Sequence, residues 1–402
     1  MTKRWMALLL AALLCLSVAG CTASEEIPAG SPAPEDPAAA ETEPETAAGV
    51  TVTETDIPGC YVYNHGGVAV VEQEDGNYLL INSGGLVIRR SDRWMDFDPA
   101  TGIVFVSDEA YYELPACELL FTKEQMEANV LAFLQENWPA GELVSLETTV
   151  MQGFREGYAS NGFRAVYDDG GYTEIYDFYA LIDAAGLVKF TTPLISYTSG
   201  GGFPIIWTLG SCSEGLVQFT EEYYSREGDV ELYETGYKDF DGNDVLVFSN
   251  NGGRDPEDAT VILYDAADVS HIGDFHDGAA VIWNAEMQES LIDRSGNLLF
   301  PFEYGSIYND RGSYPVVYNE GEGWGFIDTA GQIVLPLEYD YAIGSYGAKF
   351  VVQKGEKCGV VDVNGNELVP FEYDAISSPD RGIVYAVKDG LVSIITLPDD
   401  SY

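Results

Sequence analysis

Residues 323–339 read GWGFIDTAGQIVLPLEY, and this stretch decides the fold because the chain repeats it. An earlier copy, residues 288–304, reads QESLIDRSGNLLFPFEY, and a later copy, residues 357–373, reads KCGVVDVNGNELVPFEY. The aspartate at the centre of each copy recurs at intervals of 328 − 293 = 35 and 362 − 328 = 34 residues. In each copy, Gly follows this Asp by three positions, Pro by eight and Tyr by eleven. A period of this length indicates a solenoid, propeller or array, in which neighbouring units share an apolar core.

Each copy has the pattern of a β-hairpin followed by further strands. Phe326-Ile327 and residues 333–335 are short apolar runs of strand length, and the Asp and Gly within residues 328–331 favour a turn between them. Pro336 has no amide to donate to a sheet and therefore ends the second strand. Two more strands are expected within residues 339–353. Four short strands in about 35 residues are typical of one β-propeller blade.

This unit resembles the WG (KWG) β-repeat family of bacterial proteins, which is named for a Trp-Gly pair. The pair is literal only at Trp324-Gly325, whereas Glu289-Ser290 and Cys358-Gly359 occupy the matching places in the other two copies. The other copies are therefore divergent members. The resemblance implies a repeated β-structure, and it implies no activity because no catalytic residues are associated with the repeat.

Weaker echoes of the unit extend over most of the remaining chain. Asn82, Asp183 and Asp239 are each followed by Gly three residues later, and strand-like runs recur at residues 67–71, 215–219 and 278–282. We therefore predict an all-β repeat domain over residues 49–402, with its clearest repeats at residues 286–376. We expect it to form a closed β-propeller of seven or eight blades, and an open β-repeat array is the alternative.

The two ends of this domain predict how the ring closes. The last unit offers only three strands, at residues 373–376, 383–387 and 391–396. An isolated strand, Val50 to Thr55, precedes the first full unit. We expect this N-terminal strand to complete the last blade, which removes the exposed edges of an open array.

One segment departs from the β pattern. Residues 122–125, Thr-Lys-Glu-Gln, form a capping box that opens an amphipathic helix over about residues 122–137. Met126, Val130, Phe133 and Leu134 fall on one face of this helix. We expect this inserted helix to pack on the rim of the propeller, and a partner-binding helix is the alternative.

The N-terminus has the features of a lipoprotein signal peptide, residues 1–20. A basic start precedes an apolar run, residues 7–18, that is too short to span a bilayer. Residues 18–21, Val-Ala-Gly-Cys, resemble a bacterial lipobox, which implies cleavage before Cys21 and acylation of Cys21. The alternative is an ordinary secretory signal in which Cys21 is incidental.

Residues 21–48 differ in composition from the rest of the chain. They are rich in Ala, Glu, Pro and Thr and contain no aromatic residue, which is typical of a disordered acidic tether. Together with the signal peptide, this pattern predicts a protein that is exported and lipid-anchored to the bacterial cell membrane, with its β domain facing the outside.

The sequence is strongly acidic. Its 19 basic and 66 acidic residues give a formal charge of −47, and loss of the signal peptide with Lys3 and Arg4 gives 17 − 66 = −49. This charge excludes a nucleic-acid binder, because phosphate backbones require a basic face. It suits cationic partners or divalent ions, and we expect a monomer.

Patterns for metal binding and catalysis are weak. Residues 239–244, Asp-Phe-Asp-Gly-Asn-Asp, carry alternating oxygen side chains but lack the Gly and Glu of an EF-hand, so we interpret them as a turn rather than a calcium site. Of the three histidines, His65, His271 and His276, the last two fall in a segment expected to be an ordinary loop. No nucleophile elbow, phosphate loop or zincin motif is present.

Four cysteines remain beyond Cys15 and Cys21, namely Cys60, Cys117, Cys212 and Cys358. None forms a C-x-x-C pair, so a zinc cluster is not expected. An exported protein permits disulfides with three possible connectivities, and buried free thiols are an equal alternative. The place of Cys358 at the Trp position of the repeat favours packing.

The aromatic residues fall into two groups. Tyr304, Tyr339 and Tyr373 recur in the repeat, so we predict that they pack between blades. Tyr111-Tyr112, Tyr223-Tyr224 and Trp207 lie outside the repeat register and are candidates for an exposed recognition surface, where Tyr and Trp are enriched.

These observations predict a non-enzymatic lipoprotein of the cell envelope whose β domain binds a protein or glycan partner outside the membrane. We expect no cofactor and no metal or catalytic residue, and lipidation of Cys21 is the one modification predicted. Two alternatives stay open. One is a carbohydrate-active propeller enzyme that uses acidic residues, and the other is a structural spacer of the envelope.

Overall fold

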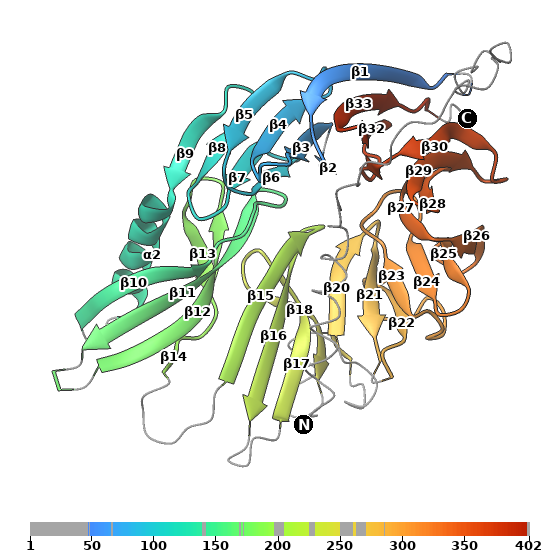
Figure 1. Ribbon diagram of the computed structural model, residues 1–402. Coiled ribbons are helices and arrows are strands. Elements are labelled where there is room, and N and C mark those ends of the chain that lie inside the picture. Colours follow the sequence, from blue (N-terminus) through green and yellow to red (C-terminus); the bar gives the residue numbers. More distant parts are fainter. Residues whose placement is uncertain are drawn as a thin grey trace, which may run out of the picture. The chain divides into compact units, whose positions relative to one another are not determined.

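The chain is built from β-sheets that follow one another along the sequence (Figure 1). The structure is a computed structural model, and it describes residues 47, 49–65, 67–138, 142–168, 170–171, 173–196, 205–224, 230–249, 260–262, 271–284 and 286–399. These residues all belong to one unit, Thr46–Tyr402. None of the helical segments in these ranges has the length and apolar character needed to cross a membrane.

Within the described ranges the strands form eight sheets, which we call blades 1 to 8. Blade 1 holds β2 (Tyr61–His65), β3 (Val68–Glu72), β4 (Tyr78–Asn82) and β5 (Val87–Ser91). Blade 2 holds β6 (Met95–Asp98), β7 (Ile103–Val106), β8 (Ala110–Glu113) and β9 (Glu118–Thr122). Blade 3 holds β10 (Glu142–Val150), β11 (Tyr158–Asp168), β12 (Thr173–Asp183) and β13 (Val188–Thr191), with β14 (Ile195–Ser196) paired to β12. Blade 4 holds β15 (Ile205–Ser213), β16 (Leu216–Tyr224), β17 (Val230–Asp239), β18 (Asp244–Ser249) and β19 (Thr260–Ile262).

The second half of the ring contains the clear repeats. Blade 5 holds β20 (His271–His276), β21 (Ala279–Trp283) and β22 (Glu289–Asp293). Blade 6 holds β23 (Ser306–Tyr308), β24 (Val316–Asn319), β25 (Gly323–Ile327) and β26 (Ile333–Tyr339). Blade 7 holds β27 (Tyr341–Tyr346), β28 (Lys349–Lys354), β29 (Lys357–Asp362) and β30 (Glu367–Tyr373). Blade 8 holds β31 (Ala375–Ile376), β32 (Ile383–Lys388), β33 (Leu391–Thr396) and, from the other end of the chain, β1 (Thr51–Pro58).

The N-terminal strand closes the ring, as the sequence predicts. β1 pairs antiparallel with β33, with Val52 opposite Ile395, and Figure 1 shows the blue strand beside the red one. Just before β1, the amide of Ala47 donates to the carbonyl of Leu368 in blade 7 at 3.1 Å. The N-terminal segment therefore fastens two consecutive blades.

Apolar cores confirm that the ring is continuous. Each pair of consecutive blades shares its own cluster of buried side chains, from blades 1 and 2 through to blades 7 and 8. A further cluster joins blade 8 to blade 1 and contains Leu79 and Ile81 of β4 with Tyr385 of β32 and Ile394 of β33. These clusters form an unbroken cycle, so the fold is a closed propeller of eight blades and not an open array.

The Asp-to-Gly interval of three marks the same turn in six blades among the described residues. The turn joins the third strand to the segment that follows it, and begins at Asn82, Asp183, Asp239, Asp293, Asp328 and Asp362. In blade 6, Asp328 Oδ1 accepts from the amides of Ala330 and Gln332 at 2.9 and 2.8 Å, and the Gly331 amide donates to the Asp328 carbonyl at 3.0 Å. Gly331 has φ = 78°, which explains why Gly is required there.

The sequence repeat is offset from the blade by two strands. One unit contributes β25 and β26 to blade 6 and then β27 and β28 to blade 7. Its proline, Pro336, lies in β26 at the edge of the sheet, and Pro370 lies likewise in β30. Proline at an edge presents no free amide to another strand, which protects the rim from edge-to-edge association.

The predicted helix is present as α2, Lys123–Asn137, and its N-cap Thr122 forms the capping box with Gln125. Met126, Val130 and Leu134 are buried, and Phe133 packs beside them in the core between blades 2 and 3. Asn129 Nδ2 also donates to the Gly186 carbonyl of blade 3 at 2.8 Å. The apolar face of α2 is therefore covered by the propeller, which confirms the packed interpretation.

Candidate binding site

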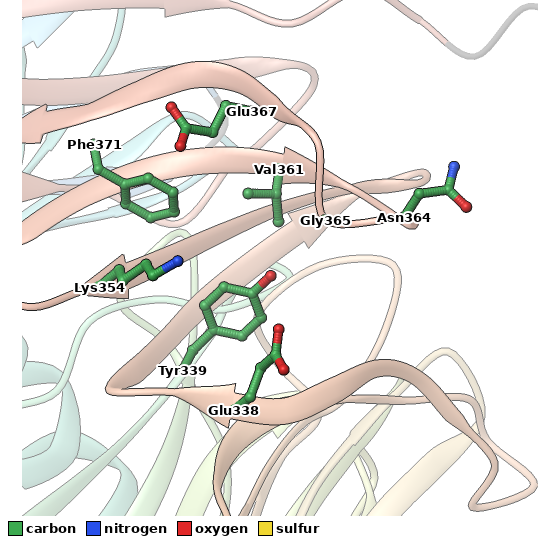
Figure 2. Close-up of a pocket in the computed structure, with 8 residues that line it drawn as sticks. All are labelled: Glu338, Tyr339, Lys354, Val361, Asn364, Gly365, Glu367 and Phe371. Carbon is green, nitrogen blue, oxygen red and sulfur yellow. The ribbon is translucent and has the colours of Figure 1, made fainter.

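A groove opens between blades 6 and 7. Its volume is about 390 Å³, and Figure 2 shows its lining residues, Glu338, Tyr339, Lys354, Val361, Asn364, Gly365, Glu367 and Phe371. Glu338 and Tyr339 come from the edge strand β26, and the others come from blade 7, with Asn364 and Gly365 in the turn between β29 and β30. In Figure 2 the ammonium end of Lys354 points between the rings of Phe371 and Tyr339. This volume lies within the range of small-molecule sites, about 300–1,000 Å³.

The side chain seven residues after the Asp of each repeat differs between two consecutive interfaces, Phe300 in one and Leu335 in the other. Between blades 5 and 6, Phe300 packs over the turn glycine Gly331, where an added Cβ would meet the Phe300 ring at 2.8 Å. The matching residue in blade 6 is Leu335, seven positions after its Asp as Phe300 is, and the matching glycine is Gly365. A Cβ on Gly365 would meet only the Tyr339 hydroxyl, at 3.7 Å. Gly365 is therefore left uncovered at this interface, whereas Phe300 covers Gly331 one interface earlier.

The groove carries charges of both signs. Lys354, Glu338 and Glu367 are exposed, and within the described part of the chain none of the three forms an ion pair. Lys357 of blade 7, by contrast, pairs with Asp374 at 2.5 Å, and Lys388 of blade 8 pairs with Glu372 of blade 7 at 2.8 Å. The groove is thus polar and charged, and its charged ends are free to contact a ligand.

Carboxylates at the turns between first and second strands serve the fold instead. Asp98 of blade 2 accepts from the amide of Gly157 in blade 3 at 3.0 Å. Glu156 of blade 3 accepts from the amide of Gly215 in blade 4 at 2.8 Å, and Glu214 of blade 4 accepts from the amide of Gly278 in blade 5 at 3.0 Å. This series joins blades 2 to 5, each to the next, through carboxylate-to-amide hydrogen bonds.

Arg294 strengthens the last of these contacts. Its guanidinium donates to Glu214 Oε2 at 2.6 Å. Burial raises the pKa of the Glu214 carboxyl, but the hydrogen bonds from Arg294 and the Gly278 amide outweigh it and hold this pKa below its usual value. Glu214 is therefore ionised at neutral pH.

Sequence reasoning missed a cluster of aromatic rings around Arg311. The Arg311 guanidinium lies 4.3 Å from the centre of the Tyr308 ring and donates to the Tyr341 hydroxyl at 2.9 Å. Trp324, of the literal Trp-Gly pair, contacts both tyrosines, with ring centres 5.9 Å from Tyr308 and 4.6 Å from Tyr341. The loop that carries Arg311 also pairs with β27, since the Ser345 amide donates to the Arg311 carbonyl at 2.9 Å. This cluster joins side chains of blade 6 to Tyr341 of blade 7.

The repeat tyrosines occupy the predicted places. Tyr304, Tyr339 and Tyr373 are buried, each in the core between its own blade and the next. The Tyr304 hydroxyl donates to the Gly331 carbonyl across the interface at 3.1 Å.

The aromatic residues that the sequence suggested for an exposed surface are buried or partly buried where the structure describes their side chains. The prediction is wrong for Tyr111, which is fully buried in the core under α2, because α2 covers this side of blade 2. Tyr112 is partly buried, with Arg89 3.8 Å from its ring centre, and Trp207 packs partly buried between blades 3 and 4. The side chains of Tyr223 and Tyr224 lie outside the described residues.

The aspartate-rich segment at residues 239–244 forms the turn that the sequence predicts. Asp239 Oδ1 accepts from the amides of Asp241 and Asn243 at 3.0 and 2.8 Å. Across the described ranges, no cluster of three or more His, Cys, Asp or Glu side chains is arranged to hold a metal ion. The expectation of a loop around His271 and His276 is wrong, because both residues belong to strand β20, where His271 packs against Trp283.

The cysteines Cys60, Cys117, Cys212 and Cys358 are all free thiols. Cys212 and Cys358 are buried, and Cys358 lies in the core between blades 7 and 8, as its place in the repeat favours. Cys60 is exposed. Cys21, the signal peptide and most of the tether lie outside the described residues.

Comparison with known proteins identifies the repeats. The profile of the family described as "WG containing repeat" matches residues 290–319, 324–358 and 359–391. The predicted resemblance is thus confirmed for this part of the chain, which contains WG repeats. No curated protein is detectably similar in sequence.

Comparison with solved structures finds distant matches. The computationally designed protein Ika8 is 14% identical, covers 86% of this chain and 98% of its own, and has a TM-score of 0.43. The WD40 β-propeller domain of Doa1 is 12% identical over 88% of this chain and 98% of its own, with a TM-score of 0.32. BBS1N, solved in complex with ARL6DN, is 9% identical over 89% of this chain and 97% of its own, with a TM-score of 0.31.

Proposed function

We propose that this chain is an exported bacterial lipoprotein, acylated on Cys21, whose propeller is a non-enzymatic binding module. Its partner is a protein or glycan of the cell envelope, and it binds in the groove between blades 6 and 7. The observation that carries this proposal is the groove itself, in which Lys354, Glu338 and Glu367 form no ion pair with any described residue and share the lining with Tyr339 and Phe371. Charged groups without an ion-pair partner can fix the orientation of a polar ligand, and aromatic rings supply contact area for it.

Binding is favoured over catalysis because of how the acidic residues are used. Asp98, Glu156 and Glu214 accept hydrogen bonds from backbone amides of the neighbouring blade, so these carboxylates contribute to the structure. The groove also holds the ammonium of Lys354 among its carboxylates, so its charge is mixed.

The membrane anchor and the groove are linked through one strand. Ala47, near the end of the predicted tether, donates to the carbonyl of Leu368, and Leu368 lies in β30 beside the groove residue Glu367. The chain therefore enters the propeller next to the groove. Such an arrangement suits a module that holds its partner near the membrane while the tether sets the distance.

Affinity capture tests this function. The mature polypeptide without lipid, residues 22–402, is immobilised beside its Leu335→Phe variant and exposed to envelope extract at moderate salt. Leu335→Phe reproduces at blades 6 and 7 the packing that Phe300 has at blades 5 and 6, and should close the groove. We expect the wild-type chain to retain a component that the variant loses. Equal retention by both columns, or none by either, would refute binding in the groove.

A further inference from the structure

The three charged residues of the groove define the kind of ligand that fits it. Lys354 supplies one positive charge, and Glu338 and Glu367 supply two negative charges within the same space of about 390 Å³. Because no counter-charge from the described chain satisfies them, a ligand that displaces water from the groove must supply charges of both signs.

Three simpler ligand classes fit less well. A ligand that is only anionic is repelled by a chain with a formal charge of −47. A ligand that is only cationic leaves Lys354 desolvated without a partner, and a neutral sugar leaves all three charges without one. A group with both an ammonium and a carboxylate satisfies both signs at once.

We infer that the groove binds a ligand that carries an ammonium group and a carboxylate group, as amino acids and short peptides do. The ligand carboxylate pairs with Lys354, and the ammonium pairs with Glu338 or Glu367. The Phe371 ring and the Tyr339 hydroxyl add an apolar face and a hydrogen bond. This inference rests on the proposed binding function of the groove, and it names the chemistry of the ligand.

The geometry singles out this interface among the repeats. Between blades 5 and 6, Phe300 fills the matching space over Gly331. Blade 8 takes its fourth strand from the N-terminus, so it has no turn that would correspond to Asn364-Gly365. Glu303, which matches Glu338 in the repeat, is exposed at the filled interface and provides a matched control.

The test is a titration of residues 22–402 with alanine, Ala-Ala and Ala-Ala-Ala, which distinguish a free amino acid from a peptide as the source of both charges. Each probe is compared with its N-acetyl and C-terminal amide forms, which remove one charge each. We expect at least one unblocked probe to bind, and either blocked form to bind at least tenfold more weakly.

Variants assign the charges. Lys354→Met should abolish the preference for a free carboxylate over its amide, and the double variant Glu338→Gln/Glu367→Gln should abolish the preference for a free amine over its acetylated form. Glu303→Gln should change neither preference. All four replaced side chains are exposed, so the fold should be retained, and a circular dichroism melt verifies this.

Several results would overturn the inference. The inference is wrong if no unblocked probe binds at millimolar concentration, or if blocked and unblocked probes bind equally. It is also wrong if a neutral oligosaccharide binds in the groove independently of Lys354. If envelope capture still depends on an open groove in these cases, only the ligand class is wrong. If capture also fails, the proposed function is wrong as well.

Discussion

Thr51 and Thr396 lie opposite each other in the antiparallel pair of β1 and β33, although 396 − 51 = 345 residues separate them in the sequence. This pairing turns a row of blades into a ring, because β33 would otherwise expose an edge of blade 8. The same N-terminal segment reaches blade 7 through Ala47 and Leu368.

Deletion of residues 49–57 should therefore destabilise the whole propeller. We expect a loss of about 3 to 5 kcal/mol, which corresponds to about 4 to 7 °C in Tm for a domain of this size. Deletion of residues 22–46, which precede the fastened segment, should leave Tm unchanged. Thermal melts followed by circular dichroism check this, and small, equal effects of the two deletions would argue against closure by β1.

Replacement of Glu214 should weaken the junction of blades 4 and 5. Glu214→Gln loses the charge that accepts from Gly278 and Arg294, and we expect a loss of about 1 to 3 kcal/mol at pH 7. Because the folded-state pKa of Glu214 lies below its unfolded value, its stabilisation is present above that unfolded value and is lost as the pH falls through the folded pKa.

The free energy of unfolding, measured by urea denaturation between pH 7 and pH 3, checks this. The wild-type chain should lose more stability towards acid than Glu214→Gln does. Parallel pH profiles of the two proteins would show that Glu214 contributes no such charge effect.

Glu289 should have the opposite pH dependence. It occupies the Trp position of the repeat and is buried, and burial raises its pKa to about 7 although the Ile307 amide donates to it at 2.5 Å. Its folded-state pKa is above the ordinary value of about 4.3, so stability falls as the pH rises from about 4.3 through about 7.

Glu289→Gln stays neutral and should avoid this loss. We expect the variant to exceed the wild type by up to roughly 3 kcal/mol at pH 8, and to match it near pH 4. Urea midpoints at the two pH values check the prediction, with exposed Glu303→Gln as the control. A variant that is less stable than the wild type at pH 8 would contradict it.

The cysteines should differ sharply in reactivity. Cys60 is exposed, whereas Cys212 and Cys358 are buried, and burial raises the pKa of the Cys358 thiol to about 11. Iodoacetamide should label Cys60 in the native protein, and should label Cys212 and Cys358 only after unfolding. Mass spectrometry of peptides reads the result, and a disulfide between any of the four cysteines would contradict the free-thiol state.

Acylation is tested at Cys21 itself. Expression with a labelled fatty acid in a bacterial host should give a labelled, membrane-bound chain, and Cys21→Ser should abolish both the label and the membrane binding. Label retained by Cys21→Ser would place the acyl group elsewhere.

Much of the fold can be predicted from the sequence, because the same short motifs recur and their hydrogen bonds involve only neighbouring residues. The interval from Asp328 to Gly331 encodes a turn whose hydrogen bonds involve only neighbouring residues, so even the divergent copy at Asp183 folds alike. The capping box at Thr122 is equally local. The unpaired strand at the N-terminus predicted closure, because a blade with three strands lacks its fourth.

The groove was not predictable, because it depends on contacts between units. Leu335 and Phe300 both read as core residues, and only the structure shows that the larger ring reaches the next turn. Tyr111 failed as a surface candidate for a related reason, since α2 and Phe154 cover it from another part of the chain. The strand at His271–His276 was not predicted, because its polar residues interrupt the alternation of apolar and polar residues that is typical of a strand.

Photo-crosslinking from the groove tests the central claim most directly. A photoreactive residue replaces Asn364, which lines the groove, in one protein. In a second protein it replaces Ala330, the matching exposed residue at the interface of blades 5 and 6. Each protein is irradiated in envelope extract. We predict a covalent adduct with an envelope component from position 364 and none from position 330. Adducts of equal yield from both positions, or from position 330 alone, would contradict binding in the groove.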